Sequence, residues 1–305
     1  MDEVVYRVTN NPITTQVAGM VIAAMYGSLA DVPVKVQPAS IDSLEPAYPC
    51  AGGTALYSTY SVGSSNPNWT AHLTDSQPLL NELENITGVS PSEPGFHKSW
   101  DHYFDNLSSR LCHSKPLPCN INDTSTYVTD AQAASVFRMG LYEYSYIYRS
   151  NPLSLHASVA SYGVYIAELA QNIRESISGN PVKYRHNVAH DGSLAMLLSI
   201  LQVDEMVWPG LGAEIVFEIF SKTASEDGAR WVRILWGGVV LRSSYPKLGS
   251  VDMMPLDTLL EYFDLLVGLG ASKVPDLCAQ MPPISGEQGV NFCVDCGEEY
   301  GLGDA

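Results

Sequence analysis

The chain has 305 residues, of which 46% are hydrophobic and 10% aromatic, with a formal net charge of −17 and a pI near 4.6. This composition excludes a disordered chain and allows a large core, arranged as one large domain with an inserted subdomain or as two domains. Nucleic acid and anionic membrane surfaces are excluded as partners because both would repel so acidic a chain, and any phosphate site must be a local basic pocket.

The N-terminal residues are predicted to form a β-α-β unit. Val4 to Thr9 is typical of a strand, Asn10-Asn11-Pro12 of a turn, and Thr14 to Met25 of a buried helix with a proline near its first position. Val32 to Val36 is predicted to be the second strand, and an extended stretch then runs to Cys50.

The longest apolar run, Val17 to Ala30, is assigned to this unit and not to a membrane segment or a signal peptide. It has about 14 residues, whereas a helix that spans a bilayer needs roughly 20. The residues before it include Asp2 and Glu3 against a single Arg7, which is not the basic segment that precedes the core of a signal peptide. We therefore expect no transmembrane segment.

Residues 51 to about 150 differ in character from those before them. Glycine, serine, asparagine and proline dominate Gly52 to Thr70, and helical patterns follow at Gln77 to Glu84 and at Trp100 to Leu111. We interpret this part as an inserted, mainly helical cap that lies over the edge of a sheet and selects substrates.

Two more helices are predicted where the cap returns to the core. One begins at a capping residue, Thr129 or Asp130, and the other spans Leu155 to Ile177, where apolar residues recur at spacings of three and four. Alternating tyrosines lie between them, which we interpret as a packing surface of the cap or of its rim: Tyr142, Tyr144, Tyr146 and Tyr148.

The final third is predicted to complete the core. Glu214 to Phe220, Arg230 to Trp236 and Val239 to Arg242 are typical of strands, Gly237-Gly238 of a two-residue hairpin turn, and Pro255 to Val267 of an amphipathic helix. The predicted class is α/β, with a mixed, mostly parallel sheet flanked by helices and the inserted helical cap. We expect the following division: core 1–50 and 150–280, cap 51–149, and C-terminal tail 281–305.

Cysteines and sequons indicate an oxidised, secreted glycoprotein. The cysteines are an even set of six, and four Asn-x-Ser/Thr sequons lie between residues 68 and 124. Cys293 and Cys296 could form half of a zinc site, but no second pair has metal-ligand spacing, so we expect a disulfide from this tail to Cys278. The other cysteines are Cys50, Cys112 and Cys119, and the sequon asparagines are Asn68, Asn85, Asn106 and Asn122.

His190 and Asp191 are the candidate site residues. A strand is predicted from Val182 to Ala189, and apolar residues at helical spacing follow from Leu194, so the His-Asp pair lies where a strand ends and a helix begins. The carboxyl edge of an open α/β sheet is where ligands bind, and a helix N-terminus offers unpaired N–H groups to an anion. An imidazolium and a carboxylic acid at such an edge suit a phosphate ester.

A longer run around this pair resembles the histidine acid phosphatases, especially the fungal enzymes. The run begins at Lys183-Tyr184, passes through His190-Asp191-Gly192-Ser193, and continues through the turn Trp208-Pro209-Gly210 to Phe217-Glu218. Its order is specific to the family: a strand, the His-Asp pair, a helix, the Trp-Pro-Gly turn and a strand that ends in Phe-Glu. Nearly all of residues 4 to 278 share in the resemblance.

The resemblance implies a role for each candidate residue. Arg7 matches the first arginine of a family segment and is expected to bind phosphate together with His190, while Asp191 is expected to be the general acid that protonates the leaving oxygen. Ile13 stands where the family has a second arginine, and Asn10 stands for an aspartate. The implied reaction is phosphomonoester hydrolysis through a phosphohistidine, with an acidic optimum, a small-molecule phosphomonoester as partner and no cofactor.

The family's nucleophile, the histidine of an Arg-His-Gly-x-Arg-x-Pro segment, has no counterpart in this sequence, so we expect the chain as given to be inactive or nearly so. His186 cannot replace it, because it lies four residues before His190 on one strand, roughly 13 Å away at about 3.3 Å per residue. Three hypotheses remain: a histidine acid phosphatase whose N-terminal strand is missing, a non-catalytic relative that binds phosphorylated ligands, and a metal-dependent hydrolase that uses His186, His190, Asp191 and the C-terminal cysteines.

Overall fold

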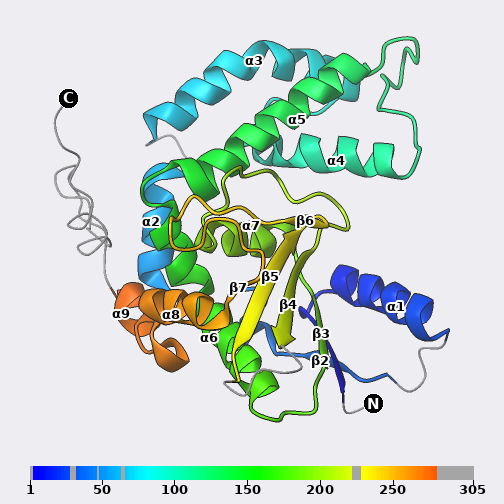
Figure 1. The fold of residues 1–305 in the computed structure, drawn as a ribbon. Helices are drawn as coiled ribbons and strands as arrows, with labels where there is room; N and C mark the ends of the chain where they lie inside the picture. The colour runs from blue at the N-terminus through cyan, green and yellow to red at the C-terminus, as the bar shows by residue number, and fades with distance from the viewer. Residues whose placement is uncertain (1–2, 28–31, 47, 63–65, 222–227, 280–305) are drawn as a thin grey trace.

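Three parallel strands form the sheet that carries the N-terminal part of the chain (Figure 1). The central strand pairs with both others, and its Arg7 lies opposite Asn187. Helix α1 (Pro12–Tyr26) joins the first two strands, so the predicted β-α-β unit is confirmed; it begins where the side chain of Asn11 accepts from the N–H of Ile13 and ends at Gly27, which has a φ of 68°. The strands are β1 (Val4–Val8), β2 (Val34–Val36) and β3 (Tyr184–Val188).

The structure is a computed structural model, and it describes residues 3–279 except for 28–31, 47, 63–65 and 222–227. Helices dominate this part of the chain, and the predicted α/β class is confirmed. None of the helices described combines the length and the apolar character that crossing a bilayer requires. Short 3₁₀ turns lie between the larger elements, at Ala39–Ile41, Pro94–Phe96 and Leu269–Ala271.

A second, antiparallel sheet lies beside the first. The predicted hairpin is confirmed at Gly237 and Gly238, whose φ values of 54° and 78° are those that a tight hairpin turn requires. The parallel and antiparallel strands thus occupy two sheets. The antiparallel strands are β4 (Ile215–Ser221), β5 (Arg230–Trp236), β6 (Val239–Val240) and β7 (Met254–Pro255).

Helix α6 (Ser154–Ile177) is the centre of the main hydrophobic core. Its apolar residues recur every three or four positions, and the fully buried Ile166 meets Leu198 and Phe263 from neighbouring helices in one cluster. Burying each such side chain stabilises the fold by about 1.5–3 kcal/mol. The helices around α6 are α2 (Ala51–Tyr60), α7 (Asp191–Ile200), α8 (Leu256–Val267) and α9 (Val274–Ala279).

Helix α2 forms in the glycine-rich stretch whose composition is typical of loops. It packs closely on α6, where a Cβ atom on Gly53 would lie 2.8 Å from Oγ of Ser161 and 3.3 Å from Cβ of Ala160. The glycine is therefore used for close contact between two helices and not for a turn.

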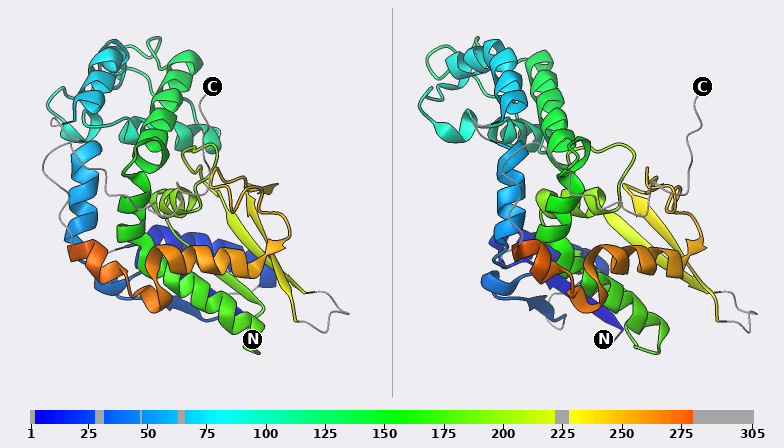
Figure 2. Two further views of the ribbon diagram at one scale, coloured as in Figure 1. Left: turned by 60° about the vertical axis from the view of Figure 1, so that its left-hand side comes forward. Right: turned by 90° about the vertical axis from the view of Figure 1, so that its left-hand side faces the viewer.

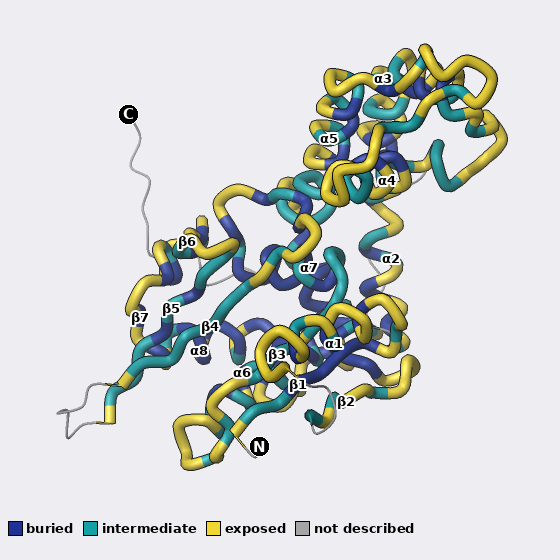
Figure 3. Tube along the Cα trace, turned by 90° about the vertical axis from the view of Figure 1, so that its right-hand side faces the viewer, coloured by how far each residue is buried: buried dark blue, intermediate teal, exposed yellow. Residues whose placement is uncertain are grey.

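Three helices form a second cluster at one end of the molecule, away from both sheets (Figures 1 and 2). Leu83, Trp100, Leu107 and Val136 are all almost completely buried there, and the tube drawing shows dark, buried segments facing each other inside this group (Figure 3). The cap boundaries at residues 51 and 149 stay a prediction. The helices are α3 (Pro67–Thr87), α4 (Asp101–Cys112) and α5 (Asp130–Ser145), and a π-helical turn (Tyr146–Ser150) follows α5.

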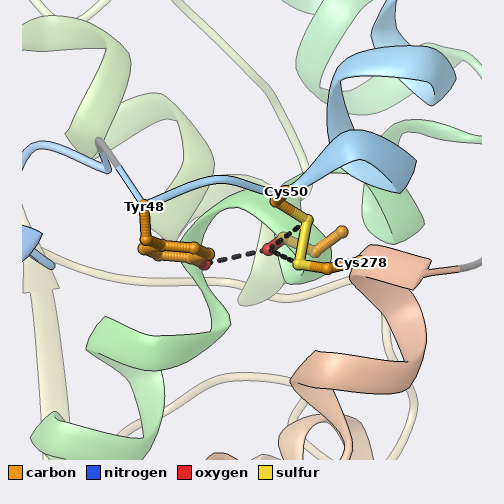
Figure 4. Close-up of a disulfide and its surroundings, with 4 residues drawn as sticks. Tyr48, Cys50 and Cys278 are labelled. Carbon is orange, nitrogen blue, oxygen red and sulfur yellow. Dashed lines mark hydrogen bonds between the residues drawn. A yellow bond between two sulfur atoms is a disulfide. The ribbon is translucent and has the colours of Figure 1, made fainter. Parts of the chain in front are cut away.

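The described disulfide joins Cys50 to Cys278, so the prediction that Cys278 pairs with the C-terminal tail is wrong (Figure 4). The two cysteines meet because the stretch before α2 and helix α9 both pack against α6. Their sulfur atoms lie 3.4 and 3.7 Å from the carbonyl oxygen of Ala160, which also accepts a hydrogen bond from Tyr48 at 2.9 Å. Cys112 and Cys119 are free and exposed, and the tail cysteines Cys293 and Cys296 lie outside the described residues.

Candidate active site

The candidate pair lies where the sequence pattern predicts it, at the junction of β3 and α7. His190 is the residue before the helix, with extended backbone angles, and Asp191 is the first helical residue. The carbonyl of His190 accepts from the N–H of Leu194 at 3.1 Å, which closes the first turn. The first N–H groups of α7 therefore point to the carboxyl edge of the parallel sheet, as an anion site requires.

The ring of His190 lies between a threonine of the neighbouring strand and an exposed carboxylate. The N–H of Thr9 donates to the carbonyl of Val188, which continues the β1–β3 pairing and brings Thr9 to the same edge. Its Oγ1 is 3.0 Å from Nε2 of His190 and 2.9 Å from Oγ1 of the buried Thr14. Oε2 of Glu45 lies 3.4 Å from the same Nε2, and the His190 side chain is 28% exposed. The ring is thus oriented by protein contacts and still open to a ligand.

Three donors converge on the carboxyl group of Asp191. The hydroxyl of Tyr144 donates to Oδ2 at 2.7 Å, and Nε1–H of Trp208 donates to the same atom at 2.6 Å. Oδ1 accepts from the backbone N–H of Gly192 at 2.7 Å. Burial, and then the charge of Asp191, raise the pKa of Tyr144 far above its ordinary value, so that its hydroxyl keeps the proton that it donates.

Sequence reasoning missed both aromatic partners of Asp191. In the sequence, Tyr144 is one of four alternating tyrosines that predict only a packing surface, and Trp208 is part of the Trp-Pro-Gly turn. The only available signal was a cluster of aromatic residues with polar atoms, which must find hydrogen-bond partners when they are buried.

Arg7 is nearly buried, and its terminal nitrogens are bound by protein groups. Nη1 donates to Glu168 at 2.5 Å, while Nη2 donates to Gln37 at 2.6 Å, to Asp42 at 2.8 Å and to Ser43 at 3.0 Å. Burial acts to lower the pKa of Arg7, but Glu168 and Asp42 outweigh it and leave the pKa above its ordinary value. A phosphate at Arg7 would have to compete with these acceptors, and the predicted role of this residue stays a prediction.

Two other positions singled out in the sequence lie apart from this arrangement. Ile13, in the first turn of α1, is 67% exposed. The ring of His186 is stacked on that of Tyr6, with centroids 5.7 Å apart, and burial lowers the pKa of His186. In the part of the chain that the structure describes, no three histidine, cysteine or acidic side chains are grouped to hold a metal ion.

Helix α4 adds negative charge to the surroundings of Asp191. Loss of hydration, followed by the charges of Asp101 and Asp191, raises the pKa of Asp105 on α4 to about 6. Asp105 is exposed, so its carboxyl group can exchange protons directly with the solvent.

The fold has counterparts among solved structures. The phytase of Citrobacter braakii, at 14% sequence identity, superposes with a TM-score of 0.58 over 87% of this chain and 79% of that chain. The phytase of Hafnia alvei, at 13% identity, superposes with a TM-score of 0.59 over 89% of this chain and 80% of that chain. The phytase of D. castellii, at 15% identity, has a TM-score of 0.51 over 100% of this chain and 65% of that chain. The chain shares the fold of these phytases. The fold that the sequence resemblance implied is therefore confirmed.

The likeness to the phytases is one of fold, since the identities are low. No protein-family model matches the chain, and no curated protein matches it in sequence. Within the phytase fold, the His190–Asp191 pair at the end of β3 is the arrangement from which a function can be argued.

Proposed function

We propose that this protein acts on phosphomonoesters at the edge formed by His190 and Asp191. The observation that carries the proposal is that these two residues are consecutive at the N-terminus of α7, with Oγ1 of Thr9 from the neighbouring parallel strand 3.0 Å from Nε2 of His190. An oxyanion there would meet an imidazole, a hydroxyl and the first N–H groups of a helix, which are groups that bind phosphate.

In the proposed chemistry, a protonated His190 holds an oxygen of the phosphate, and Asp191 gives its proton to the oxygen that leaves. The proton must be on Asp191 before that step and the imidazole must be charged, so hydrolysis should be fastest in acid. In this scheme a histidine nucleophile takes the phosphoryl group as the P–O bond to the leaving oxygen breaks, and water then cleaves the phosphohistidine. This sequence has no counterpart of that histidine, so the complete reaction is expected only of a form extended upstream by an Arg-His-Gly strand. The disulfide supports the proposal that the protein works in an oxidising, extracellular compartment.

A second candidate function is the binding of a phosphorylated ligand without turnover. Two features of the sequence favour it: the family's nucleophilic histidine has no counterpart, and Ile13 stands where the family has a second arginine. The Hafnia alvei phytase has been solved with myo-inositol hexakis sulphate, so a ligand of this kind is a reasonable probe of binding here.

Hydrolysis of an aryl phosphate at about pH 5 separates the two functions. We would compare the chain as given, its Asp191→Ala and His190→Ala variants, and a form extended upstream by an Arg-His-Gly strand, and measure phosphate affinity by calorimetry in parallel. Turnover that requires Asp191 supports hydrolysis. Phosphate binding that requires His190, with no turnover in either form, supports the binding function. If the protein neither binds phosphate nor hydrolyses the substrate, both functions are refuted.

A further inference from the structure

Three aromatic rings from separate parts of the chain are stacked beside Asp191. The Trp208 ring lies between that of Phe104, with centroids 3.9 Å apart and planes 4° apart, and that of Tyr144, at 4.0 Å and 20°. Phe104 belongs to α4 and Tyr144 to α5, whereas Trp208 follows α7 in the Trp-Pro-Gly turn. The stack therefore joins two helices of the cap cluster to the site.

Two of these rings donate to one and the same oxygen. A carboxylate oxygen has two lone pairs, and Oδ2 of Asp191 uses both, one for the Tyr144 hydroxyl at 2.7 Å and one for the Trp208 indole at 2.6 Å. Oδ1 accepts from the N–H of Gly192, which leaves it one further position. The two oxygens of Asp191 are thus not equivalent.

We infer that Tyr144 and Trp208 are positioning residues, which orient the carboxyl group of Asp191 so that Oδ1 is the atom that carries and delivers the proton. Phe104, from α4, holds the Trp208 ring in place. In this role, which rests on the proposed function, the O–H bond at Oδ1 breaks and a new O–H bond forms at the leaving oxygen. Asp191 is then a carboxylate, and the two donors on Oδ2 stabilise its charge.

Close packing connects the stack to helix α5. Gly140 of α5 faces the Phe104 and Trp208 rings so closely that a Cβ atom there would lie 2.8 Å from Cε3 of Trp208. Because the rings are packed this closely against α5, a displacement of α4 or α5 should also displace the indole N–H that donates to Asp191. A ligand that moves the cap would therefore change the orientation of Asp191.

The test compares Tyr144→Phe and Trp208→Phe, which keep an aromatic ring but remove a donor, with Phe104→Leu. The matched control is Tyr142→Phe, which removes a tyrosine hydroxyl from the same helix at a position where the side chain is 44% exposed. Each variant is made in the form extended upstream by an Arg-His-Gly strand. It is assayed with 4-nitrophenyl phosphate, whose leaving group needs little protonation, and with glycerol 2-phosphate, whose leaving group needs much.

We expect each donor variant to lower kcat for glycerol phosphate about tenfold, as the removal of one hydrogen bond to a charged group should. The loss of kcat for 4-nitrophenyl phosphate should be smaller, and KM should change little for either substrate. In an Asp191→Asn background, the donor variants should cause no further loss of kcat for either substrate. Phe104→Leu should act in the same direction. Equal losses for both substrates, or a Tyr144→Phe variant that behaves like Tyr142→Phe, would overturn the assignment.

A measurement that needs no turnover keeps this role separate from the proposed function. The indole ¹H–¹⁵N signal of Trp208, assigned by its absence in Trp208→Phe, should shift in Asp191→Asn and in Tyr144→Phe but not in Tyr142→Phe. If the protein hydrolyses neither substrate, the proposed function fails, and this signal still decides whether Asp191 is held as described. A signal that Asp191→Asn does not move would refute the positioning role.

Discussion

Arg7 donates from Nη2 to Oδ1 of Asp42 at 2.8 Å, and the two side chains are only 6% and 1% exposed. An Arg7→Ala variant would leave a buried carboxylate without its partner, which costs about 3–5 kcal/mol. We therefore expect the free energy of unfolding, measured by urea denaturation, to fall by an amount in that range.

Arg242→Ala is the control, because Arg242 pairs with Asp204 at 3.3 Å while 77% of its side chain is exposed. Its effect should stay below about 1 kcal/mol. If instead Arg7→Ala keeps its stability and loses affinity for phosphate, then Arg7 is a phosphate ligand, as the sequence resemblance implies, and not a structural residue.

Gly140→Ala should destabilise the protein by about 1–3 kcal/mol, because the added methyl group would enter the space that the Trp208 and Phe104 rings fill. The same change at Gly19 in α1, where a Cβ atom would meet nothing within 4 Å, should stabilise it by about 0.5–1 kcal/mol through helix propensity alone. The melting temperatures of Gly140→Ala and Gly19→Ala, each compared with that of the unchanged protein, check this prediction. Equal effects at the two positions would contradict the close packing beside Asp191.

The disulfide between Cys50 and Cys278 spans 228 residues of sequence. A covalent link across so long a loop restricts the unfolded chain strongly, so Cys50→Ser should lower the free energy of unfolding by about 2–5 kcal/mol. Cys112→Ser, at a free and exposed cysteine, should have little effect. Non-reducing peptide mapping gives the direct check: a fragment that joins Cys278 to the tail instead of to Cys50 would refute the pairing.

Asp105 should make the protein less stable as the pH rises. Its pKa is raised to about 6, first by loss of hydration and then by Asp101 and Asp191, so the folded state favours the neutral acid. The stability from this group is fully present below about pH 4, the ordinary pKa of aspartate, and is lost as the pH rises through about 6. Asp105→Asn should therefore melt at a higher temperature than the unchanged protein at about pH 7, and at nearly the same temperature at about pH 4.

Asp123, which lies between α4 and α5, should have the opposite effect on the pH dependence of stability. Hydrogen bonds from Ser125 and Thr126 lower its pKa, so its contribution is present at neutral pH and is lost as the pH falls through the lowered pKa. Asp123→Asn should therefore reduce stability at about pH 7 and approach the unchanged protein in strong acid. If the melting temperatures of Asp105→Asn and Asp123→Asn shift in the same direction at neutral pH, the assignment of a raised pKa to Asp105 and a lowered pKa to Asp123 is wrong.

Local sequence patterns determined the elements of this protein and the place of its candidate site. Apolar spacing, the proline at position 12 and a cap at Thr129 or Asp130 predict helices that the structure contains, and Gly237-Gly238 predicts the hairpin. The His190–Asp191 pair could be placed at a strand-to-helix junction because both flanking elements show their own periodicity. These signals involve residues a few positions apart, whose interactions are set by the geometry of the backbone itself.

Tertiary structure decided which distant residues meet. Nothing in the sequence around Cys278 distinguishes Cys50 from the nearer tail cysteines, and nothing near Arg7 predicts Asp42 and Glu168 as its partners. The same holds for Tyr144 and Trp208, which reach Asp191 only because α5 and the Trp-Pro-Gly turn pack against the start of α7. Such contacts depend on how whole helices and strands bury their apolar faces against each other, a condition that no local pattern of residues contains.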